Sequence, residues 1–168
     1  METIHQPLDF IGINMYSAES MVRAAADGQP GEVPFAPDTP RALAEWIALT
    51  PSVLYWMPKF FTERYHLPIV VTENGMANVD WVMEDGRVHD PQRIDFLTRY
   101  LRELRRAVQS GVDVRGYFYW SLMDNFEWLE GYSQRFGLIH VDYATQQRTP
   151  KDSAAWYREV IASNGGAL

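Results

Sequence analysis

The chain has 168 residues, of which 46% are hydrophobic and 22% charged, a composition typical of one globular domain rather than a disordered segment. Its formal net charge of −7 argues against nucleic acid as a partner, because binding phosphates requires a basic surface. No stretch is apolar enough for a membrane span, and the absence of cysteine excludes disulfides and thiolate metal sites, so we expect a cytoplasmic protein without a membrane partner.

The first part of the chain predicts a strand, a long loop and a helix. Residues 8–14 (LDFIGIN) form a short apolar run typical of a strand, and residues 17–45 are rich in Gly, Pro and Ala, which predicts a long loop. Thr50 and Pro51 then have the order of an N-cap and first helical residue. Apolar residues recur at helical spacing after them, and Pro58 inside this pattern predicts a kink or a break.

The middle of the chain predicts a second strand and a second helix. Residues 68–72 (PIVVT) are a β-branched run after a proline and predict a buried strand. Asp85 and Gly86 predict the turn of a small hairpin in the loop that follows. A helix is predicted to start at Asp90 and to end at Gly111.

The last part repeats this order once more. Residues 113–122 predict a third strand, which leads into a long aromatic loop, and residues 138–148 predict a hairpin. A final helix begins at Thr149. Strand, loop and helix therefore follow one another three times, which predicts an α/β fold with a parallel sheet and no separate second domain.

Glu73 occupies the most informative position in the sequence. It directly follows the strand of residues 68–72 and precedes Asn74 and Gly75, a pair that predicts a sharp turn. Its carboxylate is therefore expected at the carboxyl end of a buried strand, where α/β enzymes place their chemistry. A glutamate before Asn-Gly is also a common solvent-exposed turn residue, so the pattern alone leaves both interpretations open.

The other two strand ends carry amide, phenol, carboxylate and indole groups. Because the carboxyl ends of parallel strands meet at one edge of a sheet, we expect these groups to converge beside Glu73. Indole faces and hydrogen-bonding groups together suit a polyhydroxylated ring such as a sugar. None of the four histidines has a metal-ligand spacing, so no metal site is expected. The converging residues are Asn14, Tyr16, Trp120, Glu127 and Trp128.

Three stretches together carry a resemblance to a known family. They are LDFIGINMYS from residue 8, LPIVVTENGMA from residue 67, and RGYFYWSLMDNFEWLEGYSQRFGLIHVDYATQQRTPKDSAAWY from residue 115. With them the chain resembles the C-terminal part of the family 1 glycoside hydrolases, the β-glucosidase family. The resemblance implies a partial (β/α)8 TIM barrel, with residues 1–168 forming about three C-terminal βα units that contain strands 6 to 8.

The resemblance also implies roles for individual residues. Glu73 matches the catalytic nucleophile of the family, and Tyr16 matches the tyrosine that hydrogen-bonds this nucleophile. No metal or organic cofactor is implied. The remaining matches form the sugar subsite: Asn14 near the sugar, Trp120 under the glycone ring, Glu127 and Trp128 at its outer hydroxyls, Phe136 at its border and Trp46 on the aglycone side. Met15 departs from the family, which more often has tyrosine there, and we expect it to face away from Asn14 and Tyr16.

A part of the family's active site has no counterpart in the sequence. Retaining glycosidases need two carboxyl groups about 5–5.5 Å apart, one nucleophile and one acid/base. The family's acid/base glutamate lies in an Asn-Glu-Pro motif, which this sequence lacks. Three strands also leave two unpaired sheet edges and an exposed barrel-inner face.

The resemblance therefore implies a retaining β-glycosidase chain that hydrolyses β-D-glucosides by double displacement when a complementary N-terminal barrel fragment completes it. Alone, we expect the chain to be inactive or very weak, and its expected protein partner is either the complementary N-terminal fragment or a second copy of the chain. Two alternatives stay open from the residues. One is a carbohydrate-binding module without catalysis, and the other is a structural fragment without a ligand.

Overall fold

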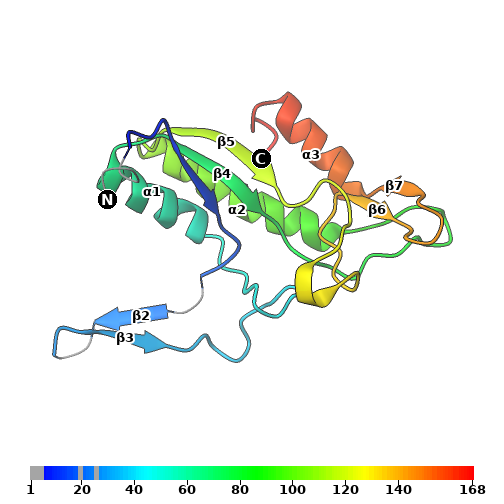
Figure 1. The fold of residues 1–168 in the computed structure, drawn as a ribbon, viewed down its shortest axis with the longest axis horizontal. Helices are drawn as coiled ribbons and strands as arrows, with labels where there is room; N and C mark the ends of the chain where they lie inside the picture. Colours follow the sequence, from blue (N-terminus) through cyan, green and yellow to red (C-terminus); the bar gives the residue numbers. More distant parts are fainter. Residues whose placement is uncertain (1–5, 19–20, 25–26) are drawn as a thin grey trace.

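The computed structural model describes residues 6–18, 21–24 and 27–168. Its centre is a parallel sheet in the strand order β1-β4-β5, which confirms the predicted parallel arrangement (Figure 1). Three helices follow the three strands along the chain. The strands are β1 (Ile11–Asn14), β4 (Ile69–Asn74) and β5 (Val114–Tyr119), and the helices are α1 (Val53–Tyr65), α2 (Pro91–Gln109) and α3 (Asp152–Ala162).

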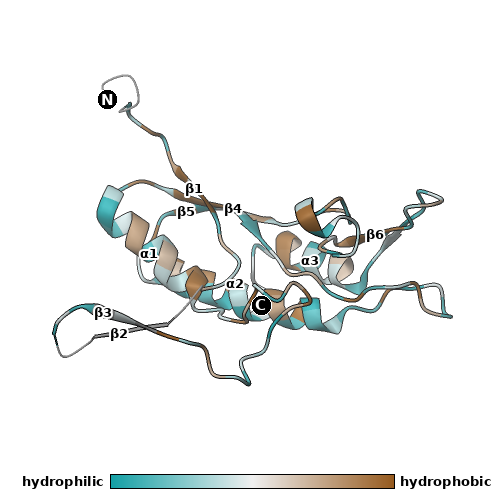
Figure 2. Cartoon of the chain, turned by 60° about the horizontal axis from the view of Figure 1, so that its bottom comes forward, coloured by the Kyte–Doolittle hydropathy of each residue, from teal (hydrophilic) through white to brown (hydrophobic). Residues whose placement is uncertain are grey.

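One face of the sheet forms the hydrophobic core. Ile13, Ile69 and Val71 point to this face and are buried together with Leu54 of α1 and Phe96 of α2. Side chains alternate along a strand, so every second residue is directed to the opposite face. Figure 2 shows hydrophobic residues along the strands and alternating hydrophobic and hydrophilic residues along α2, as an amphipathic helix requires.

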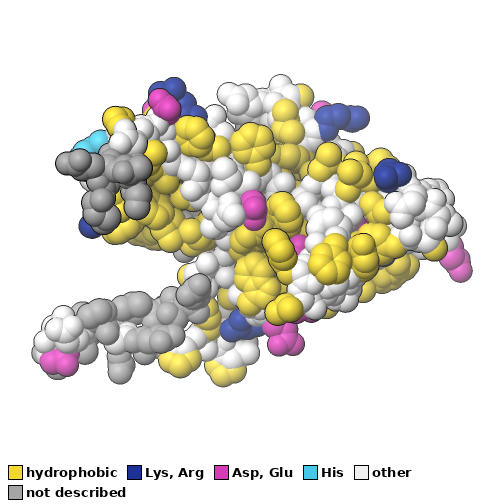
Figure 3. Space-filling view, viewed as in Figure 1, with side chains coloured by type: hydrophobic (Ala, Val, Ile, Leu, Met, Phe, Trp, Pro, Cys, Tyr) yellow, Lys and Arg dark blue, Asp and Glu magenta, His cyan; other side chains and the backbone are white. Residues whose placement is uncertain are grey.

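The opposite face of the sheet is open in the part of the chain that the structure describes. Gly12, Asn14 and Thr72 are exposed on it, and the Phe118 side chain is 61% exposed. The strands lie in front of α1 and α2 in Figure 1, and Figure 3 shows hydrophobic side chains next to polar ones in the same view. The predicted exposure of a barrel-inner face agrees with this arrangement. Among the described residues, no helix is long and apolar enough to cross a membrane.

The predicted loop of residues 17–45 contains a hairpin, so that prediction was incomplete. Strands β2 (Met21–Ala24) and β3 (Pro30–Val33) pair antiparallel and extend away from the sheet in Figure 1. The turn between them contains Gly28 at φ 77°, and the Asp27 carboxylate accepts a hydrogen bond from the Gln29 amide at 3.0 Å. The Gly and Pro content of this segment concealed the strands.

The second predicted hairpin is present, but its second strand extends over Thr149 and Pro150, so the last helix begins at Asp152 rather than at Thr149 as predicted. Strands β6 (Ile139–Val141) and β7 (Arg148–Pro150) pair antiparallel just before α3. In contrast, Asp85 and Gly86 form a tight turn without strands, in which the Met83 amide donates to the Arg87 carbonyl at 2.8 Å. A short 3₁₀ helix, η1 (Trp128–Glu130), lies in the aromatic loop after β5.

The start and interior of α1 differ from the prediction. The helix begins at Val53, after the turn residues Pro51 and Ser52, and the Thr50 hydroxyl accepts a hydrogen bond from the Ala18 amide at 2.8 Å instead of capping the helix. Pro58 does not divide α1, which continues to Tyr65. Proline removes one helical hydrogen bond, and the burial of Pro58 against the core compensates for this loss.

A histidine connects the loop before α2 to the start of α3. His89 Nδ1 lies 2.5 Å from a carboxylate oxygen of Asp152, and its Nε2 lies 2.8 Å from a carboxylate oxygen of Asp85. Arg87 also donates to Asp152, at 2.5 Å. An ionised carboxylate can accept hydrogen bonds but cannot donate them. Both ring nitrogens of His89 therefore have to donate, which requires the doubly protonated, positively charged ring. The hydrogen bonds to Asp85 and Asp152 accordingly raise the pKa of His89 above its usual value.

We expect a pH-dependent stability from this contact. A raised histidine pKa contributes stability that is complete below about pH 6.5 and is lost as the pH rises through the raised value. At pH 6 the wild-type chain should therefore unfold at a higher urea concentration than His89→Gln. The difference between the two unfolding midpoints should decrease as the pH rises. A difference that stays constant from pH 6 to pH 9 would contradict this expectation.

Candidate active site

The carboxylate of Glu73 lies at the carboxyl end of β4, as the sequence predicted. The Tyr16 hydroxyl donates a hydrogen bond to Glu73 Oε2 at 2.7 Å. The register shifts between Ile13 and Asn14, so that Asn14 pairs with Glu73, and the Met15 amide donates to the Glu73 carbonyl at 2.8 Å. Two neighbouring strands therefore fix the backbone that carries this tyrosine–glutamate pair.

Aromatic rings surround the Tyr16 side of the pair. The Tyr16 ring lies 5.2 Å from that of Trp46 and 6.2 Å from that of Phe136, both in edge-to-face geometry. Burial raises the pKa of the Tyr16 hydroxyl, and the hydrogen bond to Glu73 and the charges of Glu73 and Glu127 raise it further. Tyr16 therefore remains a protonated donor toward Glu73 over the physiological pH range.

The aromatic loop after β5 brings a second carboxylate toward the pair. Trp120 Nε1 donates to Glu127 Oε2 at 3.4 Å, and the Glu127 charge acts on the Tyr16 hydroxyl. Trp128 follows Glu127 but is 81% exposed at the start of η1. The structure thus brings Trp120 and Glu127 together and leaves the Trp128 indole in solvent.

Asn14 and Met15 lie on opposite sides of β1, as expected. Asn14 is exposed and its side-chain oxygen accepts a hydrogen bond from the Thr72 hydroxyl at 2.7 Å, whereas Met15 is buried in the core. An open pocket of about 800 Å³ borders Asn14, Tyr16 and Trp46. Every predicted site residue except Trp128 and Asn14 has a side-chain contact with another one, and Asn14 pairs with Glu73 through its backbone.

Asn74 is a residue of this region whose contacts the sequence did not predict. Its side chain is fully buried; Nδ2 donates to the Met15 carbonyl at 2.7 Å, and Oδ1 accepts from the Tyr117 hydroxyl at 2.7 Å. Its carbonyl accepts a hydrogen bond from the Trp120 amide at 2.9 Å. Asn74 thus connects all three strand ends beside Glu73.

The expected turn at Asn74 and Gly75 was wrong. Strand β4 continues through Asn74, and Gly75 follows without a turn. A Cβ atom on Gly75 would lie 1.9 Å from the Trp120 carbonyl oxygen. Glycine is therefore needed here because two backbones approach closely, and not because a turn requires it.

A buried cluster of charges underlies the same loops, and the sequence patterns did not predict it. Three carboxylates and three cations form it, with ion pairs of 2.6–2.8 Å at several contacts. Every side chain except that of Arg135 is completely buried. The opposite charges balance, which offsets the cost of removing them from water. The members are Asp80, Asp90, Arg93, Asp124, Arg135 and Lys151.

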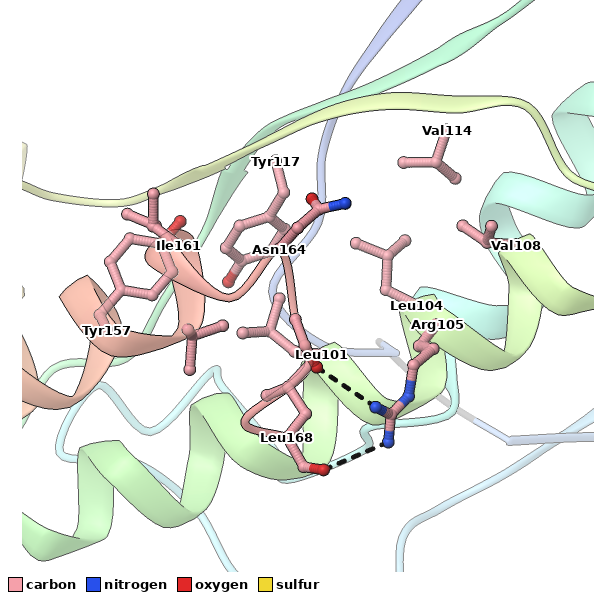
Figure 4. Close-up of a pocket in the computed structure, with 12 residues that line it drawn as sticks. Leu101, Leu104, Arg105, Val108, Val114, Tyr117, Tyr157, Ile161, Asn164 and Leu168 are labelled. Carbon is pink, nitrogen blue, oxygen red and sulfur yellow. Dashed lines mark hydrogen bonds between the residues drawn. The ribbon is translucent and has the colours of Figure 1, made fainter.

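A separate apolar pocket of about 450 Å³ lies between α2, β5 and α3 (Figure 4). Leu101 and Leu104 line it from α2 and Ile161 from α3, and Arg105 donates to the Leu168 carbonyl at 3.4 Å at its rim. It contains none of the predicted site residues. Within residues 6–18, 21–24 and 27–168, no cluster of His, Asp or Glu side chains has an arrangement that could hold a metal ion.

Comparison with known proteins decides the family. The model of Glycosyl hydrolase family 1 matches residues 1–166. This chain belongs to glycosyl hydrolase family 1. The resemblance to this family that the sequence motifs carried is thereby confirmed.

Individual family members are similar over almost the whole chain. Beta-glucosidase A of Thermotoga maritima is 46% identical over 167 residues, which are 98% of this chain and 37% of that protein. The bifunctional beta-D-glucosidase/beta-D-fucosidase of Bifidobacterium breve is 44% identical over 181 residues, covering 98% of this chain and 39% of that protein. The chain therefore spans little more than a third of the length of these relatives.

Solved structures agree with the fold. The Thermotoga maritima beta-glucosidase in complex with glucoimidazole has a TM-score of 0.84 at 45% identity, covering 95% of this chain and 36% of that one. The complex of the same enzyme with castanospermine has a TM-score of 0.87 at 44% identity, covering 98% and 37%. These similarities confirm the predicted partial α/β barrel with parallel strands.

Proposed function

We propose that this chain carries the nucleophile half of a retaining β-glycosidase site and that Glu73 attacks the anomeric carbon of a β-glucoside. The observation that carries the proposal is the 2.7 Å hydrogen bond from Tyr16 to Glu73 at the end of a central strand. A nucleophile has to be rigid and accessible at the same time. Glu73 meets both requirements, because its backbone pairs with Asn14 of β1 and the next residue, Asn74, pairs with Tyr119 of β5, while the Glu73 side chain is only half-buried.

The neighbouring groups supply a sugar subsite in this proposal. The Trp120 indole lies under the apolar face of the glycone ring, and Glu127 accepts hydrogen bonds from its hydroxyls. Phe136 borders the ring, and Trp46 contacts the aglycone across Tyr16. Asn14, whose side-chain oxygen accepts from Thr72, reaches the sugar from the exposed strand end, and the exposed Trp128 reaches it from η1. The similar Thermotoga maritima enzyme forms complexes with glucoimidazole and castanospermine, which supports a saccharide-like ligand for this chain.

The reaction proposed for Glu73 has two steps. In the first, a Glu73 oxygen forms a bond to the anomeric carbon while the bond to the leaving oxygen breaks, and a general acid protonates that oxygen. In the second step, the general acid, now deprotonated, acts as a base and removes a proton from water. The water oxygen attacks the anomeric carbon, and the bond from this carbon to Glu73 breaks. The sequence lacks the Asn-Glu-Pro motif that carries the acid/base in this family. A complementary N-terminal part of the barrel supplies it, docking on the open sheet face and the free strand edges.

Covalent labelling tests this assignment. A 2-deoxy-2-fluoro-β-glucoside with an activated leaving group needs little protonation, so it should react with Glu73 and remain attached. The purified chain should be incubated with it alone and together with the N-terminal part of the Thermotoga maritima enzyme, and the modified peptide located by mass spectrometry. We expect one label per chain on Glu73 in the mixture.

Two variants give the controls. Glu73→Gln should lose the label, and Glu63→Gln, which changes an exposed glutamate of α1, should keep it. A label on another carboxylate, or the absence of any label in the mixture, would overturn the proposal.

A carbohydrate-binding module without catalysis is the second candidate, and the 81% exposure of Trp128 favours it. Exposed indoles are suitable platforms for sugar rings. Saturable quenching of tryptophan fluorescence by cellobiose, lost in Trp128→Ala and without any covalent label, would support this function over hydrolysis.

A further inference from the structure

Lys151, the residue before α3, connects two loops that arise from different strands. Its side chain is completely buried, and Nζ donates to Asp80 Oδ2 at 2.6 Å and to Asp124 Oδ1 at 2.8 Å. Asp80 belongs to the loop that follows Glu73, and Asp124 lies in the loop between Trp120 and Glu127. One ammonium group therefore holds the two loops that border the candidate site.

Both carboxylates are fixed independently of Lys151. Asp80 Oδ2 also accepts from Arg93 Nη2 at 2.6 Å. Asp124 Oδ1 accepts from the Gly137 amide at 2.9 Å, and its Oδ2 accepts from Arg135 at 2.6 Å. Each loop thus presents an acceptor that other donors also hold, and the Nζ of Lys151 bridges the two acceptors beside the contact from Arg93 Nη2 to the Arg135 carbonyl at 2.9 Å.

The backbone of Lys151 is equally well fixed. Its amide donates to the Leu138 carbonyl at 2.9 Å, and the following Asp152 amide donates to the Val88 carbonyl at 3.1 Å. Burial and the nearby Arg93 lower the pKa of Lys151, while the two carboxylates oppose this change. Replacing a whole buried ion pair by apolar residues is often neutral for stability, whereas removing one partner alone is destabilising, so the stabilising effect of Lys151 depends on its two carboxylates.

We propose that Lys151 is a positioning residue for the candidate site, which sets the separation between the segment carrying Glu73 and the loop carrying Trp120 and Glu127. It does not contact the sugar itself. The proposal rests on the proposed function for its consequence in catalysis. Its geometric content, the dependence of the Trp120 loop on Lys151, is testable in the chain alone.

The first measurement is the indole N–H resonance of Trp120 in the ¹H–¹⁵N spectrum, assigned with Trp120→Phe. This proton lies in the hydrogen bond to Glu127 and reports the loop geometry. Lys151→Met keeps the length of the side chain and removes its charge, and Lys59→Met makes the same change at an exposed ion pair of α1. We expect the resonance to move in Lys151→Met and to stay in place in Lys59→Met.

The second measurement is the rate of covalent labelling of Glu73 in the mixture with the N-terminal part, at a temperature where circular dichroism shows every variant folded. Misplacement of a reacting group by about 1 Å costs about 100-fold in rate, so we expect Lys151→Met to be labelled about 10–100-fold more slowly than wild type and Lys59→Met. A purely structural role would lower the unfolding temperature without changing this rate in folded protein.

The outcomes separate the two proposals. A folded Lys151→Met variant with the wild-type indole resonance would overturn the positioning role, and so would one with the wild-type labelling rate. Failure of wild type to be labelled would overturn the proposed function, and the indole resonance would still decide the role of Lys151. If Lys151→Met does not fold, Asp80→Asn, which keeps the shape of one acceptor, should shift the resonance in the same direction by a smaller amount, and no shift would overturn the proposal.

Discussion

Replacing Gly75 by alanine is expected to destabilise the chain by about 1–3 kcal/mol or more, because the added methyl group has no space. Its Cβ would lie 1.9 Å from the Trp120 carbonyl oxygen and 3.2 Å from a ring carbon of Tyr119. The nearest atom belongs to the backbone, which has less freedom than a side chain. The Trp120 amide is also hydrogen-bonded to the Asn74 carbonyl at 2.9 Å, so the two segments cannot separate without losing this bond.

Equilibrium unfolding in urea, followed by tryptophan fluorescence, measures this effect. Gly116→Ala is the matched control, since it lies in β5 and its Cβ would be 3.4 Å from the nearest atom of Val70, an ordinary contact. We expect Gly116→Ala to remain close to wild type and Gly75→Ala to unfold at clearly lower urea concentration. Equal midpoints for the two variants would contradict the explanation of Gly75 by close backbone approach.

The parallel sheet and its helices were predictable because their patterns are local. The β-branched run before Glu73 and the helical spacing after Asp90 each depend on neighbouring residues. Errors arose where a tertiary contact overrode a local preference. Thr50 accepts from Ala18 instead of capping α1, and Gly75 serves the approach of two backbones instead of a turn.

The candidate site was predictable only in part for a related reason. Nothing local pairs Tyr16 with Glu73, which are 57 residues apart in the chain. The meeting of parallel strand ends predicted that they converge, and the family resemblance added the hydrogen bond between them. Trp46 lies in a segment that resembles an ordinary loop, yet its ring packs against Tyr16. The sequence predicted a turn at Asn74 because its hydrogen-bond partners, the Met15 carbonyl and the Tyr117 hydroxyl, belong to other strands and leave no local signal.

The buried charges were missed because each one looks like a surface residue in the sequence. Asp90 precedes Pro91 and has the pattern of an N-cap, but it makes no capping hydrogen bond. Its carboxylate instead pairs with Arg93 and accepts from the Ser153 amide at 2.8 Å. Charged residues are rarely buried unless paired, and their partners here are distant in sequence. Only the folded chain shows that these groups compensate one another.

Replacing Arg93 by methionine is expected to lower the free energy of unfolding by about 3–5 kcal/mol, because it leaves buried carboxylates with too few partners. The guanidinium is completely buried, pairs with Asp90, and donates from Nη2 to Asp80 at 2.6 Å and to the Arg135 carbonyl at 2.9 Å. Methionine has a similar length and no charge. Arg99→Met on the same helix is the control, since the exposed pair with Asp95 contributes about 0.2–1 kcal/mol.

The pH dependence gives this prediction a second signature. Burial alone would raise the pKa of Asp80, but Arg93 and Lys151 outweigh it and lower that pKa. A lowered carboxyl pKa contributes stability above the unfolded value of about 3.9 that is lost as the pH falls through the folded value. Without Arg93 the balance shifts toward burial, so acid unfolding followed by circular dichroism should begin at higher pH in Arg93→Met than in wild type or Arg99→Met. Equal losses of stability in Arg93→Met and Arg99→Met, with acid unfolding at the same pH, would contradict this prediction. The buried ion pairs of Arg93 would then stabilise the chain no more than a surface ion pair does, and apolar packing would hold the loops beside Glu73 in place.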